Sequence, residues 1–481
     1  MEAAFDLTAM QHLADSPIAL GSLDGRYRPV VAPLVDYLSE AGLNRARMFV
    51  EVEWLIHLLD SQVLPGAPEL TDRDRHYLRT QVAEFGADAV AELAEIEAET
   101  RHDVKAVEYY LKRRLDAAVD PLGETALSQV HEVVHIFCTS EDINNLAYAL
   151  VIKGAIEDVW LPTARGLRED VTVLAEEHAD LPMLCRTHGQ PATPSTMGKE
   201  MAVFAHRLSR QIKRVENTEF LGKINGATGT YAAHVCAVPE VDWQEVARSF
   251  VTKLGLQWNP LTTQIESHDW QSELYADVAR FNRIAHNFAT DAWTYISLGY
   301  FHQNLAAQGS TGSSTMPHKV NPIRFENAEA NLEISCALLD VLSATLVTSR
   351  LQRDLTDSST QRNIGTALGH SLLALDNLRR GLAGIDMNAQ AMAADLDSHW
   401  EVVGEAVQQT MRVAAIAGAE GMEDPYERLK ELTRGHEVDA GATAAFISSL
   451  GLPSQVEERL LKLSPATYIG IAPELVQHLG K

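Results

Sequence analysis

Apolar residues recur at steps of three and four positions along most of this chain, which is the spacing of one face of an α-helix. The clearest run covers residues 268–305. Its apolar positions include Leu274, Val278, Phe281, Ile284, Phe288, Tyr295 and Leu298. The same spacing predicts helices over residues 141–180, ended by Pro182, and over residues 321–342. Alternating patterns typical of strands are scarce, and residues 181–185 are the best candidate for an extended segment.

Long helices joined by turns rich in Gly, Pro and Ser predict an all-α protein built on a bundle of long helices. We predict an N-terminal helical domain over residues 1–127, a central helical bundle over 128–383 and a C-terminal helical domain over 384–481. The 481 residues are 46% hydrophobic and only 6% aromatic. That composition is typical of a packed helical protein with a large core.

The formal charge is −26, from 40 basic and 66 acidic residues. Such a field repels nucleic acids, so we expect no nucleic-acid partner. A small anion can still bind inside a cleft, because fields fade over about 8 Å at physiological salt. No apolar stretch approaches the roughly 20 residues that cross a bilayer. The first residues, MEAAFDLTAMQ, lack the features of a signal peptide. We therefore expect a cytoplasmic protein with no membrane partner.

Neither cysteine spacing nor glycine motifs point to a bound group. The four cysteines, Cys138, Cys185, Cys236 and Cys336, lie far apart and form no C-x-x-C pair. A disulfide framework or a thiolate metal site is therefore not expected. The chain also lacks the G-x-G-x-x-G pattern of dinucleotide-binding proteins and the His and Cys spacing of zinc sites. We predict that the protein needs neither a metal nor a cofactor.

Three polar stretches interrupt the helical pattern, and loops on a rigid scaffold often carry the chemistry of a protein. The first, residues 309–322, is too rich in Gly and Ser to form a helix. It holds Ser313, Ser314, His318 and Lys319. Most loops of this composition are mobile connectors, so the composition alone does not assign a function.

The second stretch, residues 186–195, places His188 in a turn beside two prolines. A single histidine is more often structural than catalytic. The third stretch, residues 135–145, contains Ser140, which the pattern favours as the N-cap of a helix with acidic residues in its first turn. The free N–H groups at such a helix start can also bind a carboxylate.

The first loop carries a specific resemblance. Residues 312–322, G-S-S-T-M-P-H-K-V-N-P, resemble the signature of the fumarase/aspartase superfamily. Residues 186–195, R-T-H-G-Q-P-A-T-P-S, resemble a motif of its adenylosuccinate lyase family. Four further segments are similar to that family in its longer bacterial type: S-L-D-G-R-Y at 22–27, T-R-H-D-V-K-A-V-E-Y at 100–109, R-D-L-T-D-S-S-T-Q-R at 353–362 and Y-E-R-L-K-E-L-T-R-G at 426–435. The likeness extends from about residue 20 to the end.

The resemblance implies a fumarase/aspartase-like fold and a β-elimination that releases fumarate from a succinyl-purine nucleotide. Ser313 would be the base, with its alkoxide stabilised by Lys319, by loop N–H groups and by exclusion of water. His188 would be the general acid, for which its near-neutral pKa is suited. The residues expected to bind substrate are Arg26, Tyr27, Arg101, His102, Asp103, His135, Thr139, Ser140, Gln264, Ser314, Asn321, Asn327, Arg353, Ser358 and Arg362.

Within that set, the resemblance assigns the 5′-phosphate to Arg26, Tyr27, Arg353, Ser358 and Arg362. Guanidinium groups suit bidentate contact with phosphate. His102 and Asp103 either orient His188 or hold the phosphate, and the sequence leaves both roles open. Two residues depart from the family pattern: Arg101 replaces an Asn, and Arg324 stands where an Asp often follows N-P-I. These departures affect only fine substrate contacts.

Two alternatives remain at this stage. Carboxymuconate cycloisomerases share the S-S-T-M-P-H-K loop but do not need the arginines at 26 and 353–362. A non-catalytic relative of the crystallin kind could have lost Ser313, His188 or Lys319, and all three are present.

The resemblance further implies a homotetramer whose active sites combine residues of several chains. A helical run of about 40 residues separates Thr139 and Ser140 from the loop of His188, and at 1.5 Å per residue it would hold them roughly 55 Å apart. Antiparallel packing in a symmetric assembly would bring the start of one such helix beside the end of another.

Overall fold

The computed structural model describes residues 21–304, 320–422, 424–433 and 438–480. These residues are mostly helical, and their strands form three two-stranded sheets, which confirms the predicted helical class. The chain divides into two compact units. The first comprises Met1–Ala164, Gln211–Arg283 and Ala328–Asp376, and the second comprises Arg165–Arg210, Ile284–Asn327 and Asn377–Lys481. The three domains expected from sequence, with boundaries after residues 127 and 383, stay a prediction.

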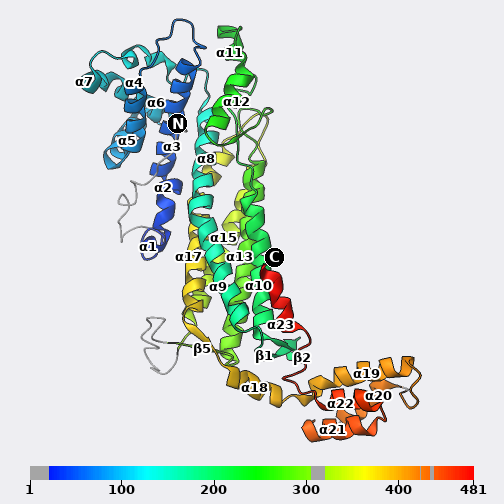
Figure 1. Ribbon diagram of the computed structural model, residues 1–481. Coiled ribbons are helices and arrows are strands. Elements are labelled where there is room, and N and C mark those ends of the chain that lie inside the picture. Colours follow the sequence, from blue (N-terminus) through cyan, green and yellow to red (C-terminus); the bar gives the residue numbers. More distant parts are fainter. Residues whose placement is uncertain (1–20, 305–319, 423, 434–437, 481) are drawn as a thin grey trace. The chain divides into compact units, whose positions relative to one another are not determined.

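The first unit begins with short helices around one long buried helix, α3. The elements are α1 Arg28–Val31, η2 Ala32–Leu34, α2 Val35–Leu38, α3 Glu40–Asp60, α4 Asp72–Ala83, α5 Ala87–Thr100, α6 Asp103–Ala117, α7 Val119–Leu122, η3 Ala126–Gln129 and η4 His131–Val133. Figure 1 shows α4 to α7 grouped beside α3. Most of α3 is buried, including Arg47 and Glu51, so its charged side chains need partners inside the protein.

A long helical run follows. It consists of α8 Ser140–Gly154, the π-helical turn η5 Ala155–Trp160 and α9 Leu161–Glu177. Pro162 cannot donate a backbone hydrogen bond, and the wide turn directly before it accommodates this loss without ending the helix. The helix predicted over residues 141–180 is therefore confirmed, although its N-cap is Thr139 and not Ser140.

Five helices contribute residues to both units: α9, α10 Met197–Glu216, α13 Asp269–Ser297, α15 Ile323–Leu346 and α17 Ile364–Leu382. The prediction that residues 268–305 form one helix was too long. The helix ends at Ser297, because Gly299 adopts a left-handed φ of +73° and the chain then enters strand β5 Phe301–Gln303. The helix predicted from residue 321 begins at Ile323.

Within the first unit, a chain of buried hydrogen bonds links four helical segments. Trp160 Nε1 donates to Ser371 Oγ at 2.9 Å, and Ser371 Oγ donates to Asn282 Oδ1 at 2.8 Å. Asn282 Nδ2 in turn donates to Ser335 Oγ at 3.0 Å. Because these polar groups satisfy one another, they fix which helix faces meet. The remaining elements of this unit are β3 Leu221–Gly222, α11 Ala232–Ala237, α12 Trp243–Lys253, β4 Gln257–Trp258 and α16 Thr356–Gln361.

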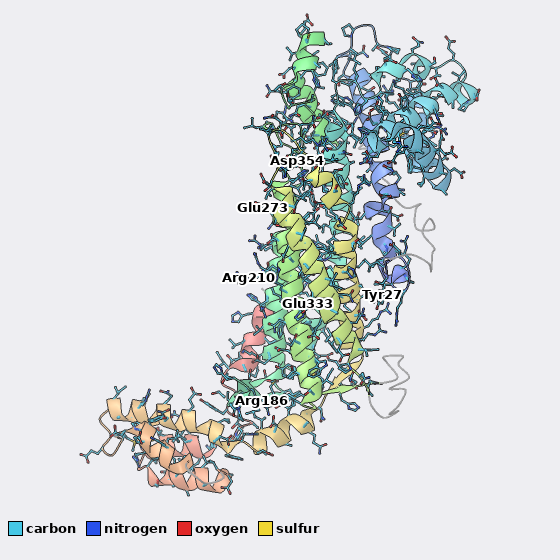
Figure 2. The ribbon with its side chains drawn as sticks, turned by 180° about the vertical axis from the view of Figure 1, so that it is seen from behind. Tyr27, Arg186, Arg210, Glu273, Glu333 and Asp354 are labelled. Carbon is cyan, nitrogen blue, oxygen red and sulfur yellow. The ribbon has the colours of Figure 1, made fainter. Side chains whose placement is uncertain are left out.

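The second unit contains an antiparallel hairpin formed by β1 Pro182–Thr187 and β2 Gln190–Thr196. The extended segment predicted near residues 181–185 is therefore confirmed. Arg186, labelled in Figure 2, lies on β1. The other elements are β6 Ile385–Met387, which pairs with β5, then α18 Ala389–Asp397, η6 Trp400–Val403, α19 Gly404–Ile416, α20 Pro425–Thr433, α21 Ala440–Ser449, α22 Ser454–Leu461, α23 Ala472–Leu475 and η7 Val476–Gly480.

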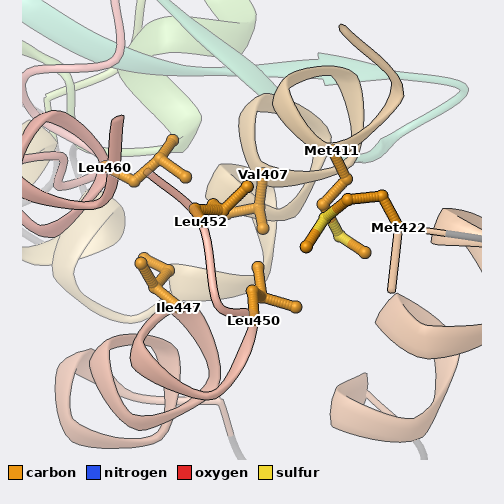
Figure 3. Close-up of a cluster of buried hydrophobic side chains, with 7 residues drawn as sticks. All are labelled: Val407, Met411, Met422, Ile447, Leu450, Leu452 and Leu460. Atoms are coloured by element: carbon orange, nitrogen blue, oxygen red, sulfur yellow. The ribbon is translucent and has the colours of Figure 1, made fainter. Parts of the chain in front are cut away.

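The short helices near the C-terminal end enclose their own hydrophobic cluster (Figure 3). Its buried residues are Val407, Met411, Met422, Ile447, Leu450, Leu452 and Leu460. They come from α19, α21, α22 and the connecting segments. Burial of these side chains holds this group of helices together, since each contributes about 1.5–3 kcal/mol when fully removed from water.

One carboxylate organises the start of α8 in the first unit. Asp142 is fully buried and accepts hydrogen bonds from the backbone N–H groups of Thr139, Asn225 and Gly226 at 2.9–3.0 Å. It also pairs with the equally buried Lys223 Nζ at 2.8 Å. The segment that follows β3 is thereby tied to the beginning of α8.

We expect Asp142→Ala to destabilise the protein by about 3–5 kcal/mol, because it leaves the Lys223 charge buried without its partner. Thermal and urea unfolding at a fixed protein concentration measure this loss. Glu245→Ala, which removes the exposed pair with Arg248, is the matched control and should have little effect. Equal stabilities of the two variants would contradict the structural role of Asp142.

Candidate active site

Two predicted site residues meet at the start of α6, in the first unit. Asp103 Oδ2 lies 2.8 Å from Arg47 Nη2 and 3.3 Å from Arg362 Nη2. Arg362 also pairs with Glu40 at 2.9 Å. Burial by itself raises the pKa of the Asp103 carboxyl, but the charge of Arg47 and the hydrogen bonds from Arg47 and Val104 outweigh it and hold the pKa below its usual value. Asp103 is therefore a carboxylate at neutral pH, and it orders Arg362.

His102 is the N-cap of α6. Its Nδ1 accepts a hydrogen bond from the Lys105 N–H at 3.2 Å, and its imidazole is about half exposed. Because Nδ1 is used by the cap, Nε2 is the ring nitrogen left to face a ligand. Arg101 precedes it with a left-handed φ of +53° as the C-cap of α5.

The start of α8 brings together the second group of predicted residues. Thr139 is the N-cap and Ser140 the first helical residue. Glu141 Oε1 lies 2.9 Å from Arg353 Nη2, and Arg353 Nη1 donates to Gln264 Oε1 at 3.4 Å. Gln264 Nε2 donates in turn to the Ala227 carbonyl at 2.9 Å.

A buried link joins these two groups. Asn144 Nδ2 donates to Glu141 Oε1 at 2.8 Å, and Asn144 Oδ1 accepts from Arg47 Nε at 2.9 Å. Arg47 and Glu141 are thus parts of the site that the sequence reasoning missed. The sequence offers a signal for Glu141, which lies inside the matched stretch 135–145. It offers none for Arg47, because Arg45 and Glu51 in the same segment are also charged.

His135 lies in the same unit with a left-handed φ of +60°, a strained conformation for a residue with a side chain. Its Nδ1 is 2.5 Å from Glu51 Oε1, and its Nε2 is 3.7 Å from Glu108 Oε1. Burial by itself lowers the pKa of His135, but the charge and hydrogen bond of Glu51, aided by Glu108, more than offset this and raise the pKa above its usual value. The structure therefore favours a cationic imidazolium at this position.

The other predicted residues of the first unit lie on nearby segments of sequence. Arg26 is exposed, and its guanidinium lies 5.8 Å from the centre of the Tyr27 ring. Figure 2 labels Tyr27, which directly precedes α1. Ser358 lies in α16, where its N–H donates to Asp357 Oδ1 at 2.6 Å. Asp357 is in turn 3.2 Å from the buried His268 Nε2.

His188 belongs to the second unit and occupies the tip of the β1–β2 hairpin. Thr187 pairs with Gln190, so His188 and Gly189 form a two-residue turn with φ of +56° and +75°. Positive φ at both positions is the type I′ geometry that suits the twist of a hairpin. His188 is exposed, and no described residue hydrogen-bonds to its side chain. Its ring therefore lies at the surface, on the turn of a hydrogen-bonded hairpin.

The hairpin is braced next to this tip. Arg186 Nη2 pairs with Asp395 at 2.6 Å, and Arg186 Nη1 donates to the Tyr300 hydroxyl at 3.2 Å. Tyr300 also donates a hydrogen bond to Asp395. These contacts fix β1 two residues before His188.

The remaining predicted residues lie around the 309–322 loop. Ser313, Ser314 and Lys319 fall outside the described residues. Asn321 is partly buried just before α15, and Asn327 Oδ1 accepts a hydrogen bond from Asn377 Nδ2 at 3.0 Å. Arg324, the residue that departs from the family pattern, donates to Asn377 Oδ1 at 3.0 Å, so its side chain has a structural partner.

The described residues contain no cluster of three or more His, Cys, Asp or Glu side chains that could hold a metal ion. In the same part of the chain, no helix is long and apolar enough to span a bilayer.

Comparison with known proteins identifies the family. A lyase family model matches residues 25–335, and a model described as the C-terminal region of adenylosuccinate lyase matches residues 349–469. Adenylosuccinate lyase of Haemophilus influenzae is 48% identical over 462 residues, which cover 96% of this chain and 98% of that protein. The Escherichia coli K12 enzyme is 47% identical over 461 residues, with the same coverage of both chains.

The chain belongs to the adenylosuccinate lyase family. The family resemblance drawn from the loop and the arginine segments is thereby confirmed.

Solved structures confirm the fold expected for a member of this family. Fumarate lyase from Mesorhizobium sp. BNC1 has a TM-score of 0.73 at 18% identity and covers 93% of this chain and 96% of its own. The 3-carboxy-cis,cis-muconate lactonizing enzyme from Pseudomonas putida has a TM-score of 0.71 at 20% identity, with 93% and 95% covered. At these identities the likeness concerns the fold alone, so it does not favour the cycloisomerase alternative.

We expect Glu51→Gln to lower the pKa of His135, because it removes the carboxylate that stabilises the imidazolium. A group whose pKa is raised by folding contributes stability below its unfolded pKa of about 6.5, and this contribution fades as pH rises through the folded value. The stability advantage of wild type over the variant should therefore be largest in mild acid and shrink toward alkaline pH.

Carbon NMR of histidine-labelled protein measures the pKa, and unfolding at several pH values measures the stability difference. Glu245→Gln, an exposed carboxylate that pairs with Arg248, is the control and should change neither. A His135 pKa that is the same in wild type and Glu51→Gln would show that Glu51 does not hold the proton.

Proposed function

We propose that this protein eliminates fumarate from adenylosuccinate to give AMP, and from the succinyl-aminoimidazole-carboxamide ribotide of purine biosynthesis. Membership of the adenylosuccinate lyase family carries the proposal, together with one structural observation. Arg353 and Arg362 are both held by one network of ion pairs and hydrogen bonds at the starts of α6 and α8.

The arginine network suits a phosphate ester. Arg353 forms an ion pair with Glu141 through Nη2 and donates a hydrogen bond to Gln264 through Nη1. Its Nε is buried without a hydrogen-bond partner among the described residues. A guanidinium carries five N–H donors, so a dianionic phosphate could accept several charge-assisted hydrogen bonds here. Arg26 is exposed and Arg362 is almost half exposed, which leaves both accessible to solvent and ligand. We assign the 5′-phosphate to these three arginines, with Tyr27 and Ser358.

The start of α8 suits a carboxylate. The first N–H groups of a helix lack intrahelical partners and carry a partial positive charge. Thr139 and Ser140 add hydroxyl donors at this end, and a raised His135 pKa places a further positive charge nearby in sequence. We assign a carboxylate of the succinyl group to Thr139 and Ser140.

In the proposed reaction, a base removes a proton from the succinyl CH₂ and the electron pair moves onto the adjacent carboxylate as an aci-carboxylate. The C–N bond then breaks, and the acid protonates the departing purine nitrogen. We assign the base to Ser313, stabilised as an alkoxide by Lys319, and the acid to His188. The exposed position of His188 on its hairpin turn supports this role, because a general acid must be able to reach the leaving group.

We further propose a homotetramer with active sites shared between chains. The arginine network and the start of α8 belong to the first unit, whereas His188 belongs to the second. An exposed catalytic histidine with no partner among the described residues of its own chain is consistent with a site that another chain completes. A cytoplasmic location stays a prediction.

Two variants test the division between chemistry and binding. The wild-type protein should release fumarate from adenylosuccinate, and the change in ultraviolet absorbance measures this reaction. Ser313→Ala should abolish kcat while leaving substrate affinity nearly unchanged. Arg353→Ala should instead raise KM about 10- to 100-fold, the loss expected for one or two hydrogen bonds to a charged group. Arg248→Ala, at an exposed ion pair, is the control. Turnover of carboxymuconate without turnover of adenylosuccinate would refute the proposed function.

Sharing between chains is tested by mixing two inactive variants, Ser313→Ala and His188→Ala, after dissociation and reassembly. If the two residues act from different chains, random hybrids carry both intact residues in about a quarter of their sites. Activity should then return to about a quarter of the wild-type level. Each variant reassembled alone is the control. If fully exchanged hybrids stay as inactive as the parents, Ser313 and His188 act from the same chain.

A further inference from the structure

Glu141 is a buried carboxylate at the start of α8, with only 3% of its surface exposed. Its Oε1 accepts a hydrogen bond from Asn144 Nδ2 at 2.8 Å and forms an ion pair with Arg353 Nη2 at 2.9 Å. The first comes from its own helix and fixes the carboxylate. The second comes from a residue 212 positions later in the sequence, so it fixes the loop that carries Arg353 relative to α8.

The same network of contacts extends to Arg362, the second arginine of the proposed phosphate site. Arg47 donates from Nε to Asn144 at 2.9 Å and pairs through Nη2 with Asp103 at 2.8 Å. Asp103 then contacts Arg362 at 3.3 Å. Asn144 therefore sits between two ion pairs and connects them.

We propose that Glu141 is a positioning residue that aims the Arg353 guanidinium at the phosphate of the substrate. The inference rests on the proposed function, because it takes Arg353 to be a phosphate ligand. A long arginine side chain loses much rotamer freedom when it is fixed, and a partner that fixes it before binding removes this loss from the binding step. Glu141 and Gln264 hold the two Nη groups, which leaves the buried Nε edge free of protein partners among the described residues.

Electrostatics alone gives the opposite expectation, which makes the inference testable. A carboxylate next to Arg353 reduces the local positive potential and repels a phosphate dianion. If only charge mattered, removing it would strengthen nucleotide binding. If positioning matters more, the loss of a fixed guanidinium weakens binding even though the repulsion is gone.

The experiment compares Glu141→Gln and Glu141→Asp with wild type. Glu141→Gln removes the charge, and Glu141→Asp keeps the charge but shortens the side chain so that it no longer reaches Arg353. We expect both variants to raise the KM for adenylosuccinate and the inhibition constant of AMP about tenfold. This is the effect expected when Arg353 loses one charge-assisted hydrogen bond to the phosphate. The kcat should change much less. The inhibition constant of fumarate, which has no phosphate, should stay unchanged, whereas a general structural defect would weaken both products.

A matched control is available in the same unit. Glu53 is also buried and binds the Arg79 guanidinium with both oxygens, at 2.6 and 3.0 Å. Among the described residues, its hydrogen bonds and ion pairs involve no predicted site residue. Glu53→Gln should lower the melting temperature as Glu141→Gln does, yet leave the AMP inhibition constant at its wild-type value.

Combining Glu141→Gln with Arg353→Ala completes the test. If Glu141 acts through Arg353, the double variant should bind AMP no more weakly than Arg353→Ala alone. Additive losses, unchanged AMP binding or tighter AMP binding in the Glu141 variants would overturn the inference. Should Glu141→Gln fail to fold, Glu141→Asp decides by the same criteria.

Failure of the proposed function would look different. In that case wild type would not act on adenylosuccinate, or Arg353→Ala would leave AMP binding unchanged. If Arg353→Ala weakens AMP binding while the Glu141 variants do not, the phosphate site stands and only the positioning role is refuted.

Discussion

One fully buried carboxylate, that of Asp142, determines how several segments of the first unit come together. Asp142 gathers three backbone N–H groups and the Lys223 ammonium around the beginning of α8. A buried charge is tolerated only when it is paired and hydrogen-bonded, so these segments must come together in one arrangement. That arrangement also sets where Thr139, Ser140 and Glu141 lie, and hence where Arg353 can be held. The fold and the proposed substrate contacts thus depend on the same buried group.

Around this point, the charged residues of the site stabilise one another. Along the network, Asp103, Arg47, Glu141 and Arg353 alternate in sign, and Asn144 bridges Arg47 and Glu141 in the middle. Such a series satisfies the requirement that buried polar groups have partners, and it restricts the rotamers of the arginines before any ligand arrives. Neutral side chains of similar size could fill the same space, but they would not prepare a positive surface for an anion.

The sequence supported the helical class, the positions of the long helices, the extended segment near residues 181–185 and the turn at His188, because each rests on local periodicity or turn-forming residues. The end of α13 was misplaced since apolar Leu298 and Phe301 continue the helical spacing beyond Gly299. Matched motifs named Asp103, Gln264, Arg353 and Arg362, and the structure brings these four residues into one network. Arg47 could not be named, because a pairing between distant residues leaves no periodic trace in a single sequence. Asn144 lies inside the matched stretch 135–145, but its position there does not indicate that it bridges two ion pairs.

The left-handed backbone at His188 affects which residues evolution can keep at this position. Left-handed backbone disfavours a histidine by about 1–2 kcal/mol relative to glycine, and asparagine also tolerates it better. Selection for stability alone would therefore replace His188, and a variant that lost it would fold at least as well. Selection for the proposed general-acid role would account for a histidine there. A descendant of this gene freed from that selection would be expected to lose the histidine early while its scaffold persists.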